Sequence, residues 1–184
     1  YGQLGDNSTT NRNTPVLTRK GNYNGITYLG DDIANPILKT KASNYHSICL
    51  AKDGTIYSFG YNGYGQLGDG TTTDRSIPVR SLKGNYTGTT YIGDNSNNPI
   101  VDINLGNYNS IVLTQDGNLF SWGYNGYGGL GDGTATNRLL PVAVLKGAYG
   151  GTAYLGDSAN NPIVSISSGM YSQTAITQNG YVFS

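Results

Sequence analysis

The chain of 184 residues contains no glutamate, one cysteine, one histidine and one tryptophan, and only 12% of its residues are charged. A single cysteine excludes an intramolecular disulfide and any zinc site that needs several thiolates. Basic and acidic residues number 11 each, so the formal net charge is zero. Nucleic acids and anionic membranes are bound through clustered Lys and Arg, and no apolar run is long enough to span a bilayer. We therefore expect neither nucleic-acid binding nor membrane insertion.

The residues that are abundant favour strands and turns. The chain has 28 glycines and 16 tyrosines, and it is also rich in Asn and Thr. Gly and Asn suit turns, Tyr and Thr suit strands, and the favoured helix formers Glu, Lys and Ala are scarce. The composition predicts an all-β protein.

One motif recurs at a fixed spacing. Tyr-Gly-Gln-Leu-Gly-Asp at residues 1–6 returns 63 residues later at 64–69, and Tyr-Gly-Gly-Leu-Gly-Asp follows at 127–132 after the same interval. A constant period of this size marks a repeat architecture, in which each unit buries its faces against its neighbours. We divide the chain into units 1–63 and 64–126 and an incomplete third unit, 127–184. Because the chain begins without Met inside this motif, we expect it to be a segment of a longer protein.

Each unit is expected to hold four or five short strands. In the second unit they are predicted at residues 79–82, 89–92, 100–105, 110–114 and 118–122. The pairs Asp53-Gly54, Asp116-Gly117 and Asn179-Gly180 are strong hairpin signals. Residues 47–51 and 56–59 are mostly apolar on both faces, which favours a sheet sandwiched between two others.

Three segments carry a family resemblance. They are Asn-Tyr-His-Ser-Ile-Cys-Leu at 44–50, Asp-Gly-Asn-Leu-Phe-Ser-Trp-Gly-Tyr-Asn at 116–125, and Tyr-Gly-Gly-Leu-Gly at 127–131. Together they resemble the RCC1 (regulator of chromosome condensation) repeat of bacterial-type RCC1-like β-propellers. The resemblance implies that the three units are blades within one longer propeller domain.

The chain also departs from the family pattern. Its unit is longer than usual, and the excess at 83–94 predicts an extra hairpin on each blade. The histidine of the pattern occurs only as His46, and Asn109 and Ser172 replace it in the later units. The loops of the three units are nearly alike, although a partner-specific face is expected to diversify its loops from blade to blade.

Several repeated positions are structural candidates. They are Arg12, Arg75 and Arg138, together with Phe59 and Trp122. An arginine at one place in every unit could pair with an aspartate of the same or the next blade, or it could belong to a ring of ligand-binding groups. We favour the structural pairing.

No catalytic residue and no cofactor are predicted, and we expect the protein not to be an enzyme. His46 would be the base of a catalytic triad, but it begins a strand and has no counterpart in the other units, so a structural or solvent-facing role is expected. Cys49 lies in an apolar run and is expected to be a small buried residue. The aspartates mostly adjoin glycines in turns, where they form local hydrogen bonds.

A calcium site is the one metal hypothesis that the sequence offers. Asp31, Asp94 and Asp157 occupy equivalent places in loops that end in Asn-Pro, and calcium prefers oxygen ligands. Only this Asp and the Asn recur, which supplies too few side-chain ligands. A turn closed by Asp and Asn side chains is the favoured alternative.

The tyrosines beside the Asn-Gly turns suggest binding. Tyr61, Tyr64, Tyr124 and Tyr127 flank these turns, and most are expected to pack between blades, whereas an exposed set would suit a protein or a sugar. The triplets at 7–9 and 85–87 fit the N-glycosylation pattern, but chance matches are expected in a chain this rich in Asn and Thr. A glycan is a candidate partner beside a protein.

Our leading functional interpretation is a non-enzymatic repeat scaffold, secreted or on the cell surface, that serves assembly or adhesion. Its protein partner would be further copies of the same repeat or chain, because three blades cannot close a propeller ring. The alternative is a soluble β-propeller binding module that regulates or inhibits a protein partner, in the manner of an exchange factor or an inhibitor.

Overall fold

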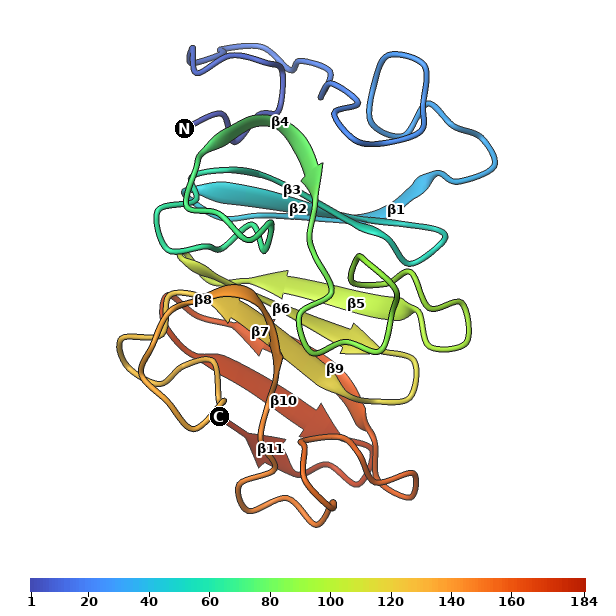
Figure 1. Cartoon of the computed structure of the whole chain (residues 1–184), viewed down its shortest axis with the longest axis vertical. Coiled ribbons are helices and arrows are strands. Elements are labelled where there is room, and N and C mark those ends of the chain that lie inside the picture. The colour runs from blue at the N-terminus through green and yellow to red at the C-terminus, as the bar shows by residue number, and fades with distance from the viewer.

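The computed structural model describes residues 1–184 and contains eleven strands and no helix. The strands form three antiparallel sheets that follow one another along the long axis of the molecule, from the N-terminal loops to the C-terminal strand (Figure 1). No helix is long and apolar enough to cross a membrane. The all-β prediction is confirmed.

The sheets repeat one topology. The first contains β1 (Ile37–Ala42), β2 (His46–Ala51), β3 (Ile56–Gly60) and β4 (Arg75–Arg80), in that order. The second contains β5 (Ile100–Leu105), β6 (Asn109–Thr114), β7 (Leu119–Gly123) and β8 (Arg138–Ala143). The third has three strands, β9 (Ile163–Ser168), β10 (Gln173–Thr177) and β11 (Val182–Phe183), with β9 and β11 at its edges.

The sheets keep the 63-residue period, because they begin at Ile37, Ile100 and Ile163. Each four-stranded sheet takes its first three strands from one sequence unit and its fourth from the next, since β4 lies beyond residue 64 and β8 beyond residue 127. The first strands contact one another, β1 with β5 and β5 with β9. They form the inner edge of the blades, and β4 and β8 form the outer edge.

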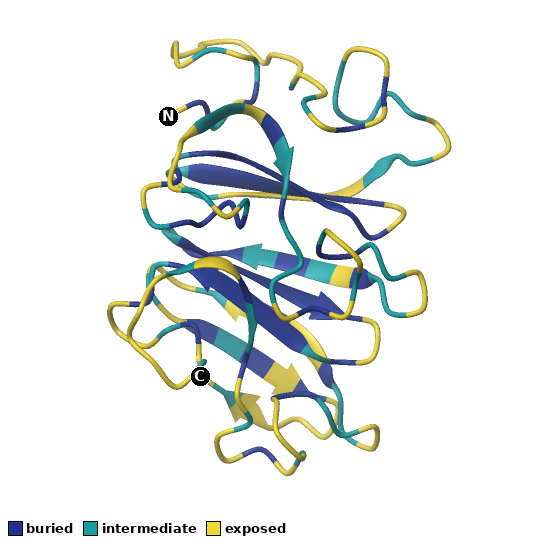
Figure 2. Cartoon of the chain, viewed as in Figure 1, coloured by how far each residue is buried: buried dark blue, intermediate teal, exposed yellow.

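Apolar side chains fill the space between the sheets. Every residue of β2, β3, β6 and β7 is buried, as the runs with two apolar faces predicted (Figure 2). One core cluster joins Ile48 and Ile56 of the first sheet to Val112 and Trp122 of the second. Another joins the second sheet to the third. The sheets therefore pack face to face, as propeller blades do.

The predicted strands at 100–105, 110–114 and 118–122 agree with β5, β6 and β7 to within one residue at each end. The predicted strand at 89–92 is wrong, because this segment makes only one isolated bridge, between Leu82 and Tyr91. The carboxylate of Asp94 accepts hydrogen bonds from the backbone N–H groups of Thr89, Thr90 and Tyr91. Those groups are consequently not available for a strand ladder, and the expected extra hairpin is a compact loop.

A candidate binding surface of clustered tyrosines

Eight tyrosine rings form one continuous cluster, which we call the tyrosine band. Its members are Tyr1, Tyr45, Tyr61, Tyr64, Tyr108, Tyr124, Tyr127 and Tyr171. Neighbouring ring centroids lie between 4.6 and 6.4 Å apart. The cluster extends across all three sheets, so it is a property of the repeat array and not of a single blade.

The repeat places these rings in register. Tyr45, Tyr108 and Tyr171 follow the first strand of successive sheets, Tyr61, Tyr64, Tyr124 and Tyr127 follow the third strand of the first two sheets, and Tyr1 is the first residue of the sequence. Tyr45 stacks on Tyr108 with a centroid distance of 4.6 Å, and Tyr108 stacks on Tyr171 at 6.0 Å. The remaining pairs are mostly edge to face, an arrangement that aromatic quadrupoles favour.

The tyrosine band is accessible to a partner. Tyr127 is 76% exposed and Tyr1 is 54% exposed, and the other six are partly buried. Burial raises the pKa of Tyr61 and of Tyr124, and a hydrogen bond with Tyr45, together with burial, raises the pKa of Tyr108. These three phenols therefore stay neutral at physiological pH. Each tyrosine of the band offers both a ring face and a hydroxyl group. Tyrosine is enriched at protein interfaces for this combination.

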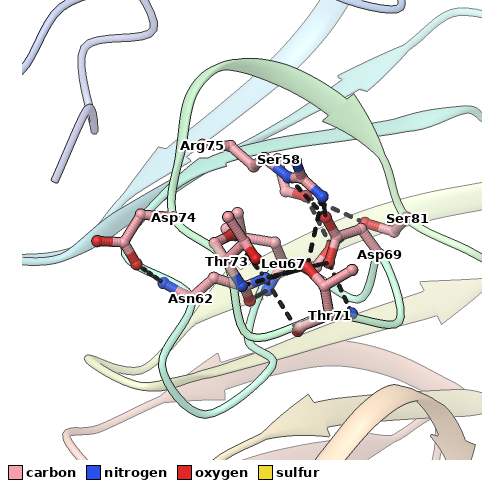
Figure 3. Close-up of polar contacts among 9 residues, drawn as sticks. All are labelled: Ser58, Asn62, Leu67, Asp69, Thr71, Thr73, Asp74, Arg75 and Ser81. Carbon is pink, nitrogen blue, oxygen red and sulfur yellow. Dashed lines mark hydrogen bonds and ion pairs between the residues drawn. The ribbon is translucent and has the colours of Figure 1, made fainter.

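A fully buried asparagine fixes the loop that carries Tyr61 and Tyr64 (Figure 3). The Asn62 side-chain amide donates to Asp69 Oδ1 at 3.0 Å and to the carbonyl oxygens of Thr71 and Thr73 at 3.0 and 3.1 Å. Its Oδ1 accepts from the Leu67 backbone N–H at 2.9 Å. One side chain thus ties together four points of a loop that has no strand of its own.

The next unit repeats this arrangement around Asn125. Its amide donates to Asp132 Oδ1 at 3.0 Å and to the carbonyl oxygens of Thr134 and Thr136, both at 3.1 Å. Neither asparagine was predicted to have a role. The signal was present, because Tyr-Asn-Gly-Tyr-Gly recurs 63 residues apart at 61–65 and 124–128.

The repeated arginines close the same loops. Arg75 Nη2 lies 2.7 Å from Asp69 Oδ2, Arg12 Nη2 lies 2.7 Å from Asp6 Oδ2, and Arg138 pairs with Asp132. Burial opposes ionisation of Asp69, but hydrogen bonds from Thr71 and Arg75 outweigh it, and the pKa of Asp69 is lowered. Each arginine pairs within its own unit. The structural pairing is therefore local and does not bridge the blades.

The calcium candidates close turns instead. Asp31 accepts backbone hydrogen bonds from Ile26, Thr27 and Tyr28 at 2.7–2.9 Å, and Asp94 and Asp157 do the same in the later units. At Asp157, burial opposes ionisation, but these hydrogen bonds outweigh it and hold the pKa at about 2. Both oxygens of each carboxylate already have donors, and no three His, Cys, Asp or Glu side chains converge as metal ligands. The geometry favours the turn interpretation.

His46 and Cys49 are core residues. His46 is fully buried, and its Nε2 and Nδ1 lie 3.0 and 3.1 Å from the hydroxyl oxygens of Ser110 and Ser43. The Ser110 hydroxyl donates to the Gln66 carbonyl oxygen, so Nε2 of the neutral imidazole is the donor to Ser110. His46 thus links the first sheet to the second, and the solvent-facing alternative is wrong. Burial raises the pKa of the Cys49 thiol to about 12, which leaves it unreactive.

We expect stability to fall as the pH is lowered, because of His46. Burial lowers the pKa of His46 to about 3, whereas an unfolded histidine titrates near about 6.5. Between these values the unfolded state binds more protons, so the free energy of unfolding falls by about 2 kcal/mol from pH 7 to pH 5. Urea unfolding at the two pH values measures this loss. His46→Asn, which copies Asn109 of the next unit, is expected to abolish most of the difference, and an equal loss in this variant would contradict the assignment.

Comparison with known proteins supports the fold. The family model described as "Regulator of chromosome condensation (RCC1) repeat" matches residues 53–113 and 116–176, and a second model of that repeat matches 37–66 and 100–128. The RCC1 domain-containing protein RUG3, mitochondrial, of Arabidopsis thaliana is 29% identical over 147 residues, which cover 79% of this chain and 28% of RUG3.

Solved structures show the same fold. Human WBSCR16 superposes with a TM-score of 0.65 at 21% identity, over 90% of this chain and 38% of that one. Prp20p from Saccharomyces cerevisiae superposes with a TM-score of 0.57 at 17% identity, over 80% of this chain and 32% of Prp20p. The chain therefore spans well under half the length of these relatives.

Proposed function

Because this chain belongs to the RCC1 repeat family, we propose that it is a non-enzymatic protein-binding part of a β-propeller, with the tyrosine band as its contact surface. The observation that carries this proposal is the continuity of eight partly exposed tyrosines across three blades. The proposal corresponds to the binding-module alternative of the sequence analysis.

Two features of the band support binding. The loops beneath it are held by Asn62 and Asn125, so little order has to be gained when a partner docks. Tyrosine side chains also supply a large contact area for only two rotatable side-chain bonds. Since charged residues are sparse, affinity would come from aromatic contacts and depend little on salt.

The similarity to Prp20p adds a weaker argument. The structure of Prp20p was described together with its binding properties to Gsp1p and histones, so a propeller of this kind can bind proteins. The sequence-based expectations of a secreted or cell-surface location, of adhesion and of a bound glycan are further proposals. Fractionation of the source cells tests the first, and a glycan array tests the last.

Replacing Tyr108 and Tyr124 together by serine is expected to weaken binding of a protein partner at least tenfold, because both rings lie at the centre of the band. Quantitative affinity capture from the source organism, followed by calorimetric titration of the protein retained most strongly, measures the effect. Circular dichroism checks that the variant is folded.

The matched control is Tyr181→Asn. Tyr181 is 66% exposed but lies outside the band, and Asn118 occupies its place in the preceding unit. The proposal requires that Tyr181→Asn binds the protein partner as tightly as the unaltered chain does. Equal binding by the double variant, or retention of glycans and of no protein, would refute it.

A further inference from the structure

Two rings of the tyrosine band, those of Tyr45 and Tyr108, lie closer together than any other pair in it. Their centroids are 4.6 Å apart, and their planes are inclined by only 18°. Every other pair except Tyr108 with Tyr171 is tilted or edge to face. Tyr45 and Tyr108 each lie in the turn between the first and second strands of a four-stranded sheet. Their contact therefore joins two adjacent, complete blades.

The phenol ends of these two rings meet. A side-chain hydrogen bond joins Tyr45 to Tyr108. In two nearly parallel phenols whose oxygens are in contact, the ring carbons ortho to the hydroxyl groups are neighbours too. The unpaired electron of a tyrosyl radical resides partly on these ortho carbons, and two such radicals join there to form dityrosine. The pair is thus positioned for this coupling, since reaction needs rotation of the side chains and no movement of the blades.

The backbone on both sides of the contact is fixed. The Tyr61 N–H donates to the Tyr45 carbonyl oxygen, and the Tyr124 N–H donates to the Tyr108 carbonyl oxygen, both at 2.9 Å. Each turn of the pair is therefore tied to the end of the third strand of its own sheet, so the two rings have defined starting positions.

His46 draws the two turns together. It follows Tyr45 directly, and its Nε2 donates to the hydroxyl oxygen of Ser110, two residues beyond Tyr108, at 3.0 Å. In the next unit Asn109 replaces this histidine, and its side-chain amide makes no hydrogen bond. The rings of Tyr108 and Tyr171 are correspondingly farther apart, at 6.0 Å. The single histidine of the chain thus marks the closest tyrosine pair.

Side chains that compete for oxidation are shielded around this pair. Cys49 and Trp122 are the only cysteine and the only tryptophan of the chain, and both are buried. Neither a thiol nor an indole at the surface is therefore available to reduce a tyrosyl radical. Neighbouring rings of the tyrosine band lie within 6.4 Å of each other, so a radical formed on one ring can pass to the next until two radicals meet at the closest pair.

We propose that Tyr45 and Tyr108 couple to form an inter-blade dityrosine when the protein meets a one-electron oxidant generated from hydrogen peroxide, such as the activated haem of a peroxidase. Each phenol loses one electron and one proton, and a carbon–carbon bond forms between the two ortho carbons. The two ortho hydrogens then move to the phenoxyl oxygens as the rings regain their aromaticity. Hydrogen peroxide accepts the two electrons and two protons and is reduced to two molecules of water.

The cross-link would fasten the first blade to the second. It goes beyond the proposed binding function, because the coupling needs no protein partner. The two tyrosines are 63 residues apart in the sequence, and a covalent link across a loop of this length restricts the unfolded state and thereby stabilises the fold. A chain with one cysteine cannot obtain this effect from an intramolecular disulfide.

Peptide mapping after oxidation tests the proposal. Trypsin cleaves after Lys and Arg, so it places Tyr45 on peptide 42–52, as its only tyrosine, and Tyr108 on peptide 84–138. The full chain at low concentration is treated with a haem peroxidase and hydrogen peroxide, and the monomeric fraction is isolated and digested. The expected main product, identified by mass spectrometry and by dityrosine fluorescence, is peptide 42–52 joined to peptide 84–138 with the loss of two hydrogen atoms.

Tyr108→Phe keeps the ring but removes the hydroxyl group that has to be oxidised. It is expected to lower the yield of this product at least about tenfold, because no other tyrosine is held as close to Tyr45 within the same blade pair. Tyr91→Phe is the matched control. Tyr91 is also partly exposed and lies on peptide 84–138, but it is outside the tyrosine band, so its replacement is expected to leave the yield unchanged.

Urea unfolding of the oxidised monomers tests the consequence. The cross-linked chain is expected to unfold at a higher urea concentration than Tyr108→Phe treated in the same way. The proposal would be overturned by the absence of dityrosine, by coupling only between copies, or by a main product that joins other peptides. An undiminished yield in Tyr108→Phe, or equal unfolding midpoints of the two oxidised proteins, would also overturn it.

Discussion

Trp122→Ala is expected to lower the free energy of unfolding by about 3–5 kcal/mol, because it removes a large buried ring and leaves a cavity. Trp122 has no exposed surface and belongs to the core between the first and second sheets. Its Nε1 donates to the Gln66 carbonyl oxygen at 2.9 Å. The loop at Gly68 packs directly against the ring, because a Cβ added there would lie 2.8 Å from Nε1. Because the total free energy of unfolding of a small domain is about 5–15 kcal/mol, this loss is a large part of the stability.

The control for this variant is Trp122→Phe. Phe59 holds the same position in the first sheet and is buried against the Gly5 loop, so the repeat already accommodates phenylalanine there. The Gln66 carbonyl oxygen keeps the hydrogen bond from Ser110, and the expected loss is only about 1–1.5 kcal/mol. Urea unfolding followed by circular dichroism separates the two variants. Equal losses would show that the ring volume at this position does not hold the sheets together.

The repeat made most of the fold predictable. A period of 63 residues without insertions predicted units of equal structure, and the sheets do begin 63 residues apart. The Asp-Gly and Asn-Gly pairs predicted the hairpin turns correctly, because such turns need a residue with positive φ, and Gly54, Gly117 and Gly180 all adopt it. Strands with two apolar faces were correctly read as buried, since such runs fit a layer between two others.

Two features could not be read from sequence patterns. The segment at 89–92 has the composition of a strand, but the Asp94 carboxylate competes for its backbone N–H groups, and this outcome depends on where the loop folds back. The burial of Asn62 was also hidden, because asparagine is usually exposed in turns. Only the structure shows that the loop wraps around its amide group.

The near-identity of the loops acquires a different meaning in the structure. From the sequence alone, near-identical loops count against a partner-specific face, since such a face should vary from blade to blade. In three dimensions, identical loops bring Tyr45, Tyr108 and Tyr171 into one continuous stack. Repetition therefore builds an extended surface, which suits a partner that contacts several blades at once.

Asn62→Ala is expected to lower the free energy of unfolding by about 2–4 kcal/mol, because it leaves the fully buried Leu67 N–H without its acceptor and removes the amide donor that Asp69, Thr71 and Thr73 share. The hydrogen bond from the residue-62 backbone N–H to the Asp74 carboxylate persists in the alanine variant. The effect also extends to the tyrosine band, since Tyr61 and Tyr64 flank Asn62 and lose the loop that orients them. Chemical unfolding measures the first effect, and near-ultraviolet circular dichroism of the tyrosines measures the second.

Asn97→Ala separates this role from a general effect of removing an asparagine. Asn97 is exposed, and Ala34 holds its place in the first unit, so the expected change lies within about 0.5 kcal/mol. If Asn62→Ala loses stability and also loses the tyrosine signal, the buried amide is what holds the band in a binding-ready arrangement. If it loses stability while the signal is unchanged, packing between the rings is sufficient to align them, and the asparagine serves the fold alone.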